Sequence, residues 1–313
     1  MFSIAERQAK DREGTTLKKL YGVITAMTTP FDKEGNVDVQ ALERAVDFQI
    51  EKGVNCLYPC GTTGEMFLMT AEQRKLVAET VVRKAAGRVT VYIHCGAMDP
   101  CEVVELANHA HDIGADGVGI VTPTYFSLDS RMMIEYYRGI CEKLPKGFPV
   151  YVYVIPQLAH NDIDGATMQK IADACPDNVI GVKYSFADMR RMVDYCEVNG
   201  GTFSVVFGPD DLFLPALSMG ADGTVSGCAG CIPEPFVEVY RCWKAGDLEG
   251  AKKAQFTCFD LVKKLHYGAD MSIFKHVLDD RGVGGGHAKA PLLDLADETV
   301  EPLLETLRPY YKK

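Results

Sequence analysis

Short runs of β-branched and other apolar residues alternate with longer helical segments along this chain of 313 residues, from Tyr21 onward. Such alternation is typical of parallel strands that are connected through helices. Eight runs are predicted to be strands: residues 22–27, 56–59, 90–94, 117–121, 150–155, 179–182, 203–207 and 223–226. Eight strands alternating with helices predict an α/β fold of the (β/α)8 type, the TIM barrel.

Apolar residues recur every three or four positions between the runs, as helices require, in segments such as 39–51, 71–86, 101–113 and 188–198. Beyond Ser226 the chain shows only helical patterns, over residues 234–245, 248–267, 271–280 and 298–307. An open doubly wound sheet would usually carry a Gly-rich phosphate motif after an early strand, and none stands there. We therefore expect an N-terminal extension (1–20), a barrel (21–231) and a C-terminal helical segment (232–313) packed on the barrel.

Composition narrows the class of protein. Hydrophobic residues make up 47% of the chain and charged residues 24%, as in ordinary globular proteins. The net charge is -10, from 33 Lys and Arg against 43 Asp and Glu, and the basic residues are scattered, which argues against nucleic-acid binding. The first sixteen residues lack the apolar core of a signal peptide, and no run reaches the ~20 apolar residues of a membrane span. We expect a cytoplasmic protein with no membrane partner.

The eleven cysteines are an odd number and stand mostly in apolar segments, where a reduced thiol packs as a small hydrophobe. Cys228 and Cys231 form a lone C-x2-C motif, without a second pair at zinc-finger spacing or a histidine close behind it. We expect buried free thiols at these positions and no metal site.

Lys183 follows the apolar run 179–182 and so stands at the carboxyl end of a buried strand, the end at which TIM barrels carry their active sites. Burial disfavours an ammonium ion and lowers the pKa of a lysine from about 10.4. The neutral amine can attack a ketone and form a Schiff base. The alternative is a structural lysine whose charged end reaches solvent.

Other strand ends carry further candidates. The second strand runs into Cys60-Gly61-Thr62-Thr63-Gly64-Glu65, whose glycines allow close backbone approach and whose amides and hydroxyls can face a carboxylate. This stretch could also be a plain turn that starts a helix. Tyr153, on one face of the fifth strand, can accept and return a proton, although buried tyrosines are often structural.

Two more strand ends offer polar side chains. Tyr125 follows the fourth strand with neighbouring hydroxyls, and packing is its default role. Asp210 and Asp211 follow the seventh strand, where they could hold substrate hydroxyls or cap the next helix.

In order and spacing, several stretches resemble the dihydrodipicolinate synthase and N-acetylneuraminate lyase family of class I aldolases. They are Thr28-Thr29-Pro30-Phe31, Gly61-Thr62-Thr63-Gly64-Glu65, Val121-Thr122-Pro123, Tyr153 with Pro156, Gly181-Val182-Lys183 and Gly220-Ala221-Asp222-Gly223. The resemblance implies that the Lys183 amine forms an imine with the C2 carbonyl of pyruvate or of a 2-keto sugar acid, that Tyr153 moves protons, and that Gly61, Thr62 and Thr63 hold the carboxylate. It requires no metal or organic cofactor.

The resemblance extends to quaternary structure and to the rest of the pocket. Tyr125 matches a family tyrosine that usually completes the site of a neighbouring subunit, which implies a homo-oligomer, commonly a tetramer. The further residues expected to bind substrate are Leu158, Ser185, Asp210, Asp211 and Val225.

Four positions depart from common family residues: Val154, Leu158, His160 and Gly230. Dihydrodipicolinate synthases have an arginine at the position of Leu158, which binds the carboxylate of the second substrate. A leucine there resembles the sialic acid lyases, whose substrates are neutral polyols beyond the keto acid. We therefore expect reversible aldol cleavage of a 2-keto sugar acid, such as N-acetylneuraminate, to pyruvate and an aldehyde. Condensation of pyruvate with aspartate semialdehyde and a keto-deoxy-gluconate-type aldolase remain alternatives.

Two other classes of protein use similar barrels. A non-catalytic sensor of keto acids could keep the carboxylate loop, but it would not require a buried amine beside a phenol. A metal-dependent lyase would need His and carboxylate ligands at several strand ends, and only His94 stands at such a position.

Overall fold

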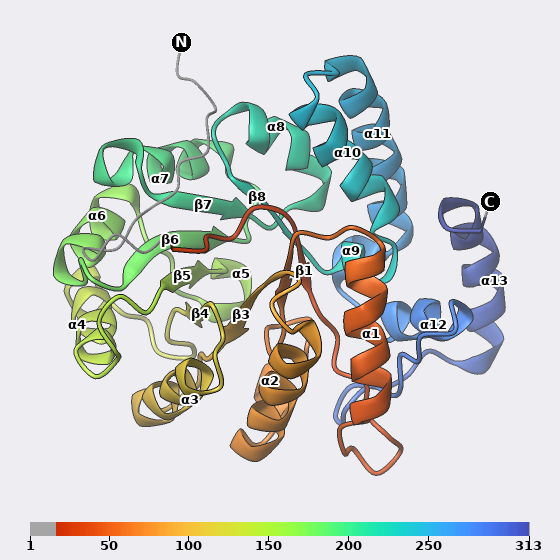
Figure 1. The fold of residues 1–313 in the computed structure, drawn as a ribbon, viewed down its shortest axis with the longest axis horizontal. Helices are drawn as coiled ribbons and strands as arrows, with labels where there is room; N and C mark the ends of the chain where they lie inside the picture. Colours follow the sequence, from red (N-terminus) through yellow and green to blue (C-terminus); the bar gives the residue numbers. More distant parts are fainter. Residues whose placement is uncertain (1–16, 313) are drawn as a thin grey trace.

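The computed structural model describes residues 17–312, so residues 1–16 of the expected N-terminal extension lie outside the described part. Eight parallel strands close into a barrel in sequence order, and β8 pairs with β1 (Figure 1). The strands are β1 (Gly22–Ala26), β2 (Cys56–Tyr58), β3 (Thr90–His94), β4 (Gly117–Val121), β5 (Val150–Val154), β6 (Val179–Tyr184), β7 (Ser204–Phe207) and β8 (Gly223–Ser226). The predicted TIM barrel is confirmed.

Strand β6 is longer than the sequence pattern predicted. Lys183 belongs to the strand, because it pairs with Tyr153 of β5 on one side and Val206 of β7 on the other. The hydrogen-bonded strand therefore fixes the position of the Lys183 backbone. A loop after the strand would hold it less firmly.

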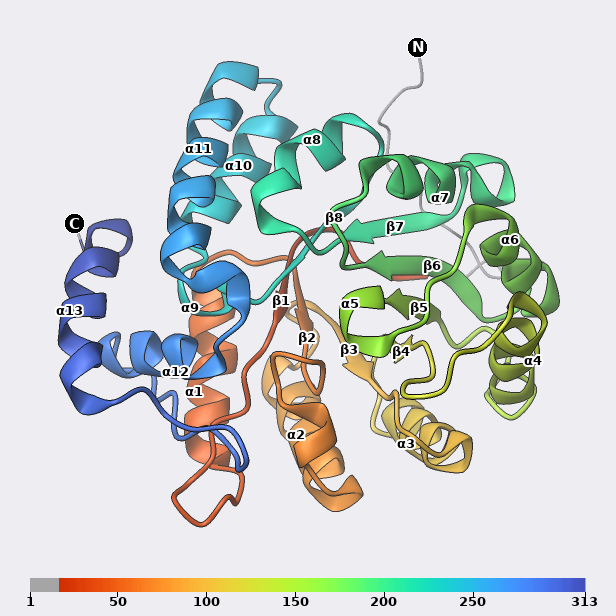
Figure 2. The ribbon, with the colours of Figure 1, turned by 180° about the vertical axis from the view of Figure 1, so that it is seen from behind.

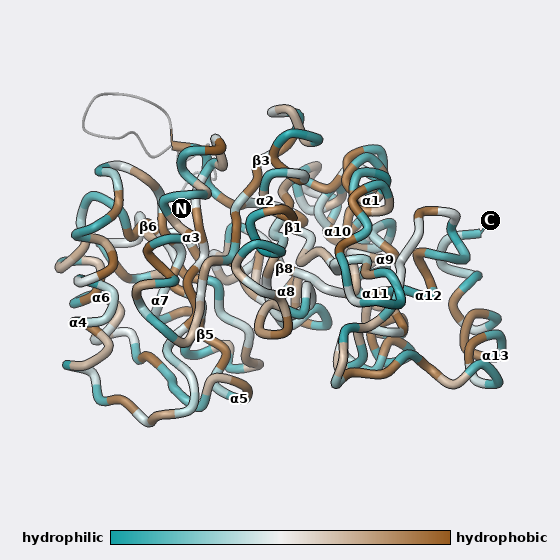
Figure 3. The backbone as a smooth tube through the Cα atoms, turned by 90° about the horizontal axis from the view of Figure 1, so that it is seen from below, coloured by the Kyte–Doolittle hydropathy of each residue, from teal (hydrophilic) through white to brown (hydrophobic). Residues whose placement is uncertain are grey.

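Aspartate and threonine side chains begin many of the outer helices by accepting hydrogen bonds from the first free amides, as Asp38, Asp99 and Thr70 do. The helices around the barrel are α1 (Val39–Glu51), α2 (Ala71–Ala85), α3 (Pro100–Asp112), α4 (Ser130–Cys141), α5 (Pro156–Ala159), α6 (Gly165–Ala174), α7 (Met189–Gly201), α8 (Phe213–Ser218) and α9 (Cys228–Cys231). In Figure 3 the tube of the outer helices alternates between hydrophilic and hydrophobic stretches, as expected of helices with one buried face.

The amino-terminal end of the barrel interior is filled by aromatic side chains. The rings of Tyr92 and Tyr151 meet edge to face with centroids 5.2 Å apart, and the Tyr151 hydroxyl accepts a hydrogen bond from the Leu20 amide. Gly117 and Gly181 make room for these rings, because a Cβ on either would lie within 2.5 Å of a tyrosine ring carbon. This end of the barrel is a packed floor, which leaves the opposite end for a site.

The C-terminal helices are α10 (Glu234–Lys244), α11 (Leu248–Lys264), α12 (Met271–Asp280) and α13 (Asp297–Leu307). They lie on one side of the barrel next to α1, with α13 outermost (Figures 1 and 2). Arg44 of α1 donates a hydrogen bond to the carbonyl of Val283, and Arg281 pairs with Glu234. No helix among residues 17–312 is long and apolar enough to span a membrane.

Nine of the eleven cysteines are buried, and all eleven carry free thiols. Cys228 and Cys231 lie in the short helix α9 with their thiols buried, as the sequence predicted. Within the described residues no group of His, Cys, Asp and Glu side chains is arranged to hold a metal ion.

Candidate active site

The Lys183 amine lies inside the carboxyl-terminal end of the barrel between two tyrosine rings. Its Nζ is 3.9 Å from the centroid of the Tyr153 ring and 4.4 Å from that of the Tyr58 ring, and the residue is only 3% exposed. The ring faces attract an ammonium ion, but the loss of water around it costs more. Burial accordingly lowers the pKa of Lys183 to about 7, so a large fraction of the amine is neutral and nucleophilic near neutral pH.

The Tyr153 hydroxyl lies beside the loop that follows β2. Its oxygen is 3.2 Å from Oγ1 of Thr62, and the two hydroxyls share a hydrogen bond. Burial raises the pKa of Tyr153, while the hydroxyls of Thr62 and Ser185 lower it in part. The phenol is therefore protonated at neutral pH and can donate a proton before it accepts one.

The loop from Gly61 to Glu65 is a compact turn held by its own backbone. The Gly64 amide donates to the Gly61 carbonyl over 3.0 Å, and the Glu65 amide donates to the Thr62 carbonyl over 3.0 Å. Within residues 17–312 the Thr62 and Thr63 amides have no hydrogen-bond partner, and both residues line the cavity beside Lys183. Two free amides and two hydroxyls at one place can bind a carboxylate. We refer to residues 61–64 as the carboxylate loop.

A cavity of about 630 Å³ opens above Lys183. Most of the residues proposed from the sequence line it: Thr62, Thr63, Tyr153, Leu158, Lys183, Ser185, Asp210, Asp211 and Val225. The elements that carry them are β5, α5, β6, β8 and the loops after β2, β6 and β7. The structure thus brings together side chains that are more than 160 residues apart in the sequence.

Two predicted residues do not line this cavity. Gly61 begins the carboxylate loop, and a Cβ on it would lie 3.4 Å from the Tyr58 ring. Tyr125 is 78% exposed, has a left-handed backbone (φ 76°) and packs edge to face on Phe126. Among residues 17–312 Tyr125 does not line the cavity, and its role in the site of a neighbouring subunit stays a prediction.

Asp210 is the acidic group whose charge acts on the pKa of Lys183. It is 8% exposed, and its Oδ1 has no hydrogen-bond partner among the described residues. Burial raises the pKa of Asp210 to about 7, opposed by contacts with Ser226 and Cys228. When ionised, Asp210 raises the pKa of Lys183. The two groups therefore influence each other in the same pH range.

Sequence reasoning missed several contributors to the site. Tyr58 of β2 covers one side of the Lys183 amine, and strand alternation places it on the inner face with Cys56. Gln157, Cys228 and Tyr267 also line the cavity. Tyr267 follows α11 in a left-handed turn (φ 55°), a position that no periodicity in the sequence indicates.

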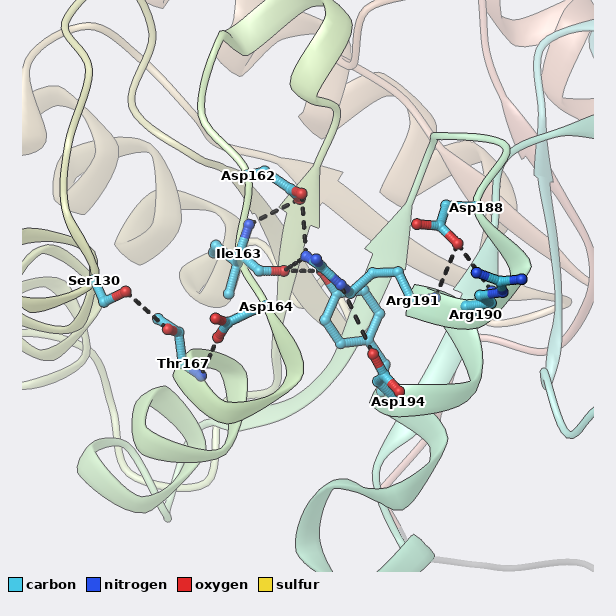
Figure 4. A network of polar contacts seen from close by, with 10 residues as sticks. Ser130, Asp162, Ile163, Asp164, Thr167, Asp188, Arg190, Arg191 and Asp194 are labelled. Carbon is cyan, nitrogen blue, oxygen red and sulfur yellow. Dashed lines mark hydrogen bonds and ion pairs between the residues drawn. The ribbon is translucent and has the colours of Figure 1, made fainter.

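A polar network holds residues 162–167, which follow α5, the short helix of Leu158 (Figure 4). Arg191 of α7 donates to the Ile163 carbonyl over 2.7 Å and pairs with Asp162 over 3.0 Å. Asp164 caps α6, and Thr167 of that helix donates to Ser130 at the start of α4. The segment after α5 is thereby tied to the helix that follows the lysine strand.

The rate of imine formation should follow the titration of Lys183. With saturating pyruvate, we expect the initial rate to rise about tenfold per pH unit below pH 7 and to level off above it, because only the neutral amine attacks. Asp210→Asn removes a charge that raises the pKa of Lys183, so the midpoint should move to lower pH. Asp211→Asn is the matched control and should leave the midpoint in place. A midpoint that stays or rises in Asp210→Asn would contradict the assignment.

Comparison with known proteins places the chain in a family. Residues 19–309 match the model of the dihydrodipicolinate synthetase family. The chain is 32% identical to the 4-hydroxy-tetrahydrodipicolinate synthase of Aquifex aeolicus, covering 92% of this chain and 97% of that protein. It is 30% identical to the N-acetylneuraminate lyase of Mediterraneibacter gnavus, covering 92% of each.

A solved structure agrees with this placement. YagE from Escherichia coli K12, a prophage protein of the dihydrodipicolinic acid synthase family solved in complex with pyruvate, superimposes with a TM-score of 0.87 at 26% identity, covering 93% of this chain and 98% of that one. The eight-stranded barrel with C-terminal helices agrees with membership in this family of class I lyases. The chain belongs to the dihydrodipicolinate synthase and N-acetylneuraminate lyase family of pyruvate-dependent aldolases.

Proposed function

We propose that this aldolase cleaves and forms the carbon–carbon bond of a 2-keto sugar acid, with pyruvate as one product and a neutral hydroxyaldehyde as the other. The observation that carries the proposal is the charge of the cavity. Among residues 17–312, Lys183 is the one cationic side chain in its lining, whereas Asp210 and Asp211 also line the cavity. Acidic side chains accept hydrogen bonds from substrate hydroxyls, and they repel a second carboxylate.

The reaction begins when the neutral Lys183 amine attacks the C2 carbonyl to form a carbinolamine, whose hydroxyl leaves as water when the protonated imine forms. Tyr153 donates a proton to that oxygen, and the Tyr153 anion is stabilised by the Thr62 hydroxyl. In cleavage, Tyr153 then takes the proton of the C4 hydroxyl as the C3–C4 bond breaks and its electrons pass to the imine nitrogen. Protonation at C3 and hydrolysis release pyruvate. Throughout, the Thr62 and Thr63 amides hold the carboxylate.

The relatives do not choose between substrates, because a synthase and a lyase match at nearly equal identity, 32% and 30%. Leu158 supports the lyase hypothesis. It lines the cavity and is 55% exposed, and an apolar side chain at this position cannot pair with the carboxylate of aspartate semialdehyde. The test is a turnover screen of N-acetylneuraminate, keto-deoxy sugar acids, and pyruvate with aspartate semialdehyde. Cleavage of a sugar acid is the expected result, and efficient turnover of aspartate semialdehyde instead would overturn the substrate proposal.

Leu158→Arg should change the preference for the aldehyde. A guanidinium at this exposed position on the cavity wall can pair with a substrate carboxylate, and we expect kcat/KM for aspartate semialdehyde with pyruvate to rise at least about tenfold. Leu158→Gln, which adds polarity but no charge, is the control and should give little gain. An equal gain in both variants would contradict the role of charge.

We also propose that the chain forms a homotetramer in the cytoplasm. The exposed rings of Tyr125 and Phe126, 78% and 68% exposed, support a contact with a second copy of the chain. Light scattering of the wild type and of Tyr125→Ala tests the assembly. A monomeric wild-type protein that still forms the imine would exclude a contribution of Tyr125 from a neighbouring subunit.

A further inference from the structure

Glu65 ends the turn that contains the carboxylate loop, but its side chain leaves the cavity and is fully buried in the protein. Its backbone is left-handed, with φ 61° and ψ 41°. One carboxylate oxygen, Oε1, lies 2.6 Å from Nζ of Lys275, and the other accepts a hydrogen bond from the Lys289 amide over 2.7 Å. Glu65 therefore follows the carboxylate loop directly in the chain, while its side chain binds the C-terminal segment.

The Lys275 ammonium is surrounded by three oxygens. It forms an ion pair with Glu65, Nζ donates to the Thr29 carbonyl over 2.8 Å and to the His287 carbonyl, and its side chain is 1% exposed. Burial lowers the pKa of Lys275, and the charge of Glu65 opposes that effect. Three acceptors converge on one cation, which fixes its position closely.

Further contacts hold the carboxylate loop from the side of the barrel. The Thr29 hydroxyl donates to the Gly64 carbonyl over 3.0 Å, and a Cβ on Gly64 would lie 3.1 Å from the Met27 carbonyl oxygen. Gly285 passes so close to Lys275 that a Cβ there would lie 2.0 Å from its carbonyl oxygen. The glycine run 282–286 thus lets the chain wrap around the ion pair.

Stability alone does not account for this pair. A buried ion pair loses much of its attraction to desolvation, and apolar side chains of similar volume often serve a core as well. The ion pair fixes the geometry of the turn that Glu65 ends, and Thr62 and Thr63 of that turn line the cavity. We propose that Glu65 and Lys275 are positioning residues that hold the carboxylate loop for pyruvate, so that the C-terminal segment is part of the keto-acid site. This inference rests on the proposed imine chemistry at the same site.

The test measures how imine trapping by borohydride depends on pyruvate concentration in the full-length protein. For Glu65→Gln we expect the half-maximal pyruvate concentration to rise at least about tenfold, with the trapping rate at saturation changed less than about threefold. The reason is that the loop binds the carboxylate in ground and transition states alike. The double variant Glu65→Gln with Lys275→Met carries no unpaired buried charge and should show the same weakened binding. A wild-type midpoint in either variant would overturn the inference.

The matched control is Glu234→Gln, which breaks the ion pair between Glu234 and Arg281, the residue just after the C-terminal end of α12. It should lower the melting temperature and leave the pyruvate midpoint unchanged. If Glu234→Gln shifted the midpoint as much as Glu65→Gln does, the pair of Glu65 and Lys275 would only stabilise the fold, and the inference would be wrong.

If the Glu65 and Lys275 variants do not fold, hydrogen exchange of the wild type tests the inference. Pyruvate should then protect residues 284–289 together with residues 60–66, and protection of residues 60–66 alone would overturn the inference. Failure of the wild type to trap pyruvate would instead reject the proposed function.

Discussion

Lys183→Met is expected to abolish the borohydride-trapped adduct with pyruvate and to lower kcat/KM by about 10⁴-fold or more. Within the part of the chain that the structure describes, Lys183 supplies the one amine that lines the cavity, so we expect the imine to form there. Mass spectrometry of the trapped protein locates the adduct, and the aldol assay gives the rate. Lys170→Met, at an exposed position of α6, is the control and should behave as the wild type.

The fold of the Lys183→Met variant should be intact and more stable near neutral pH. The pKa of Lys183 is about 7 in the folded protein and about 10.4 in an unfolded chain, so the unfolded state binds the additional proton between these values. The wild type is therefore destabilised by a few kcal/mol at pH 7 and regains that stability as pH rises toward 10.4. The variant should melt several degrees higher at pH 7, and the difference should shrink as pH increases. An adduct elsewhere, or a less stable variant at pH 7, would contradict the desolvated amine.

The barrel could be predicted from the sequence because its signals are local. Each strand is a short apolar run, and each helix repeats its apolar residues within a few turns, so the eight units can be recognised one at a time. The site follows from the fold, since parallel strands in a barrel end at one rim. The sequence therefore predicts that Lys183, Tyr153 and Thr62 lie close together, and all three line one cavity. Helices α5 and α9, with four residues each, are too short to show a period and were missed.

The remaining features depend on contacts between distant parts of the chain. Tyr58 could be placed on the inner face of β2, but only the closed barrel brings its ring to the Lys183 amine. The ion pair of Glu65 and Lys275 joins a loop of the barrel to a helix of the C-terminal segment. The sequence around each residue does not indicate which residue is its partner. A buried charge in a sequence therefore indicates that a partner exists without indicating which one.

Tyr153→Phe is expected to lower kcat by about 10² to 10³-fold while changing the half-maximal pyruvate concentration little. The phenylalanine ring still covers the Lys183 amine, whose Nζ lies 3.9 Å from the ring centroid, so the pKa of the lysine should change little. What is lost is the hydroxyl that shares a hydrogen bond with Thr62 and moves protons to and from the substrate. The adduct at Lys183 should still form, but more slowly, as stopped-flow or quenched trapping would record.

Tyr151→Phe is the matched control, because this tyrosine lies two residues earlier on the same face of β5. Its hydroxyl bonds Ser204 and the Leu20 amide at the floor of the barrel, away from the cavity. Removing that hydroxyl should reduce the free energy of unfolding by about 1–3 kcal/mol, since buried partners lose their hydrogen bonds, and leave kcat unchanged. If Tyr153→Phe and Tyr151→Phe slowed the reaction equally, the effect would come from a disturbed strand β5. The proton transfer would then belong to a group other than Tyr153.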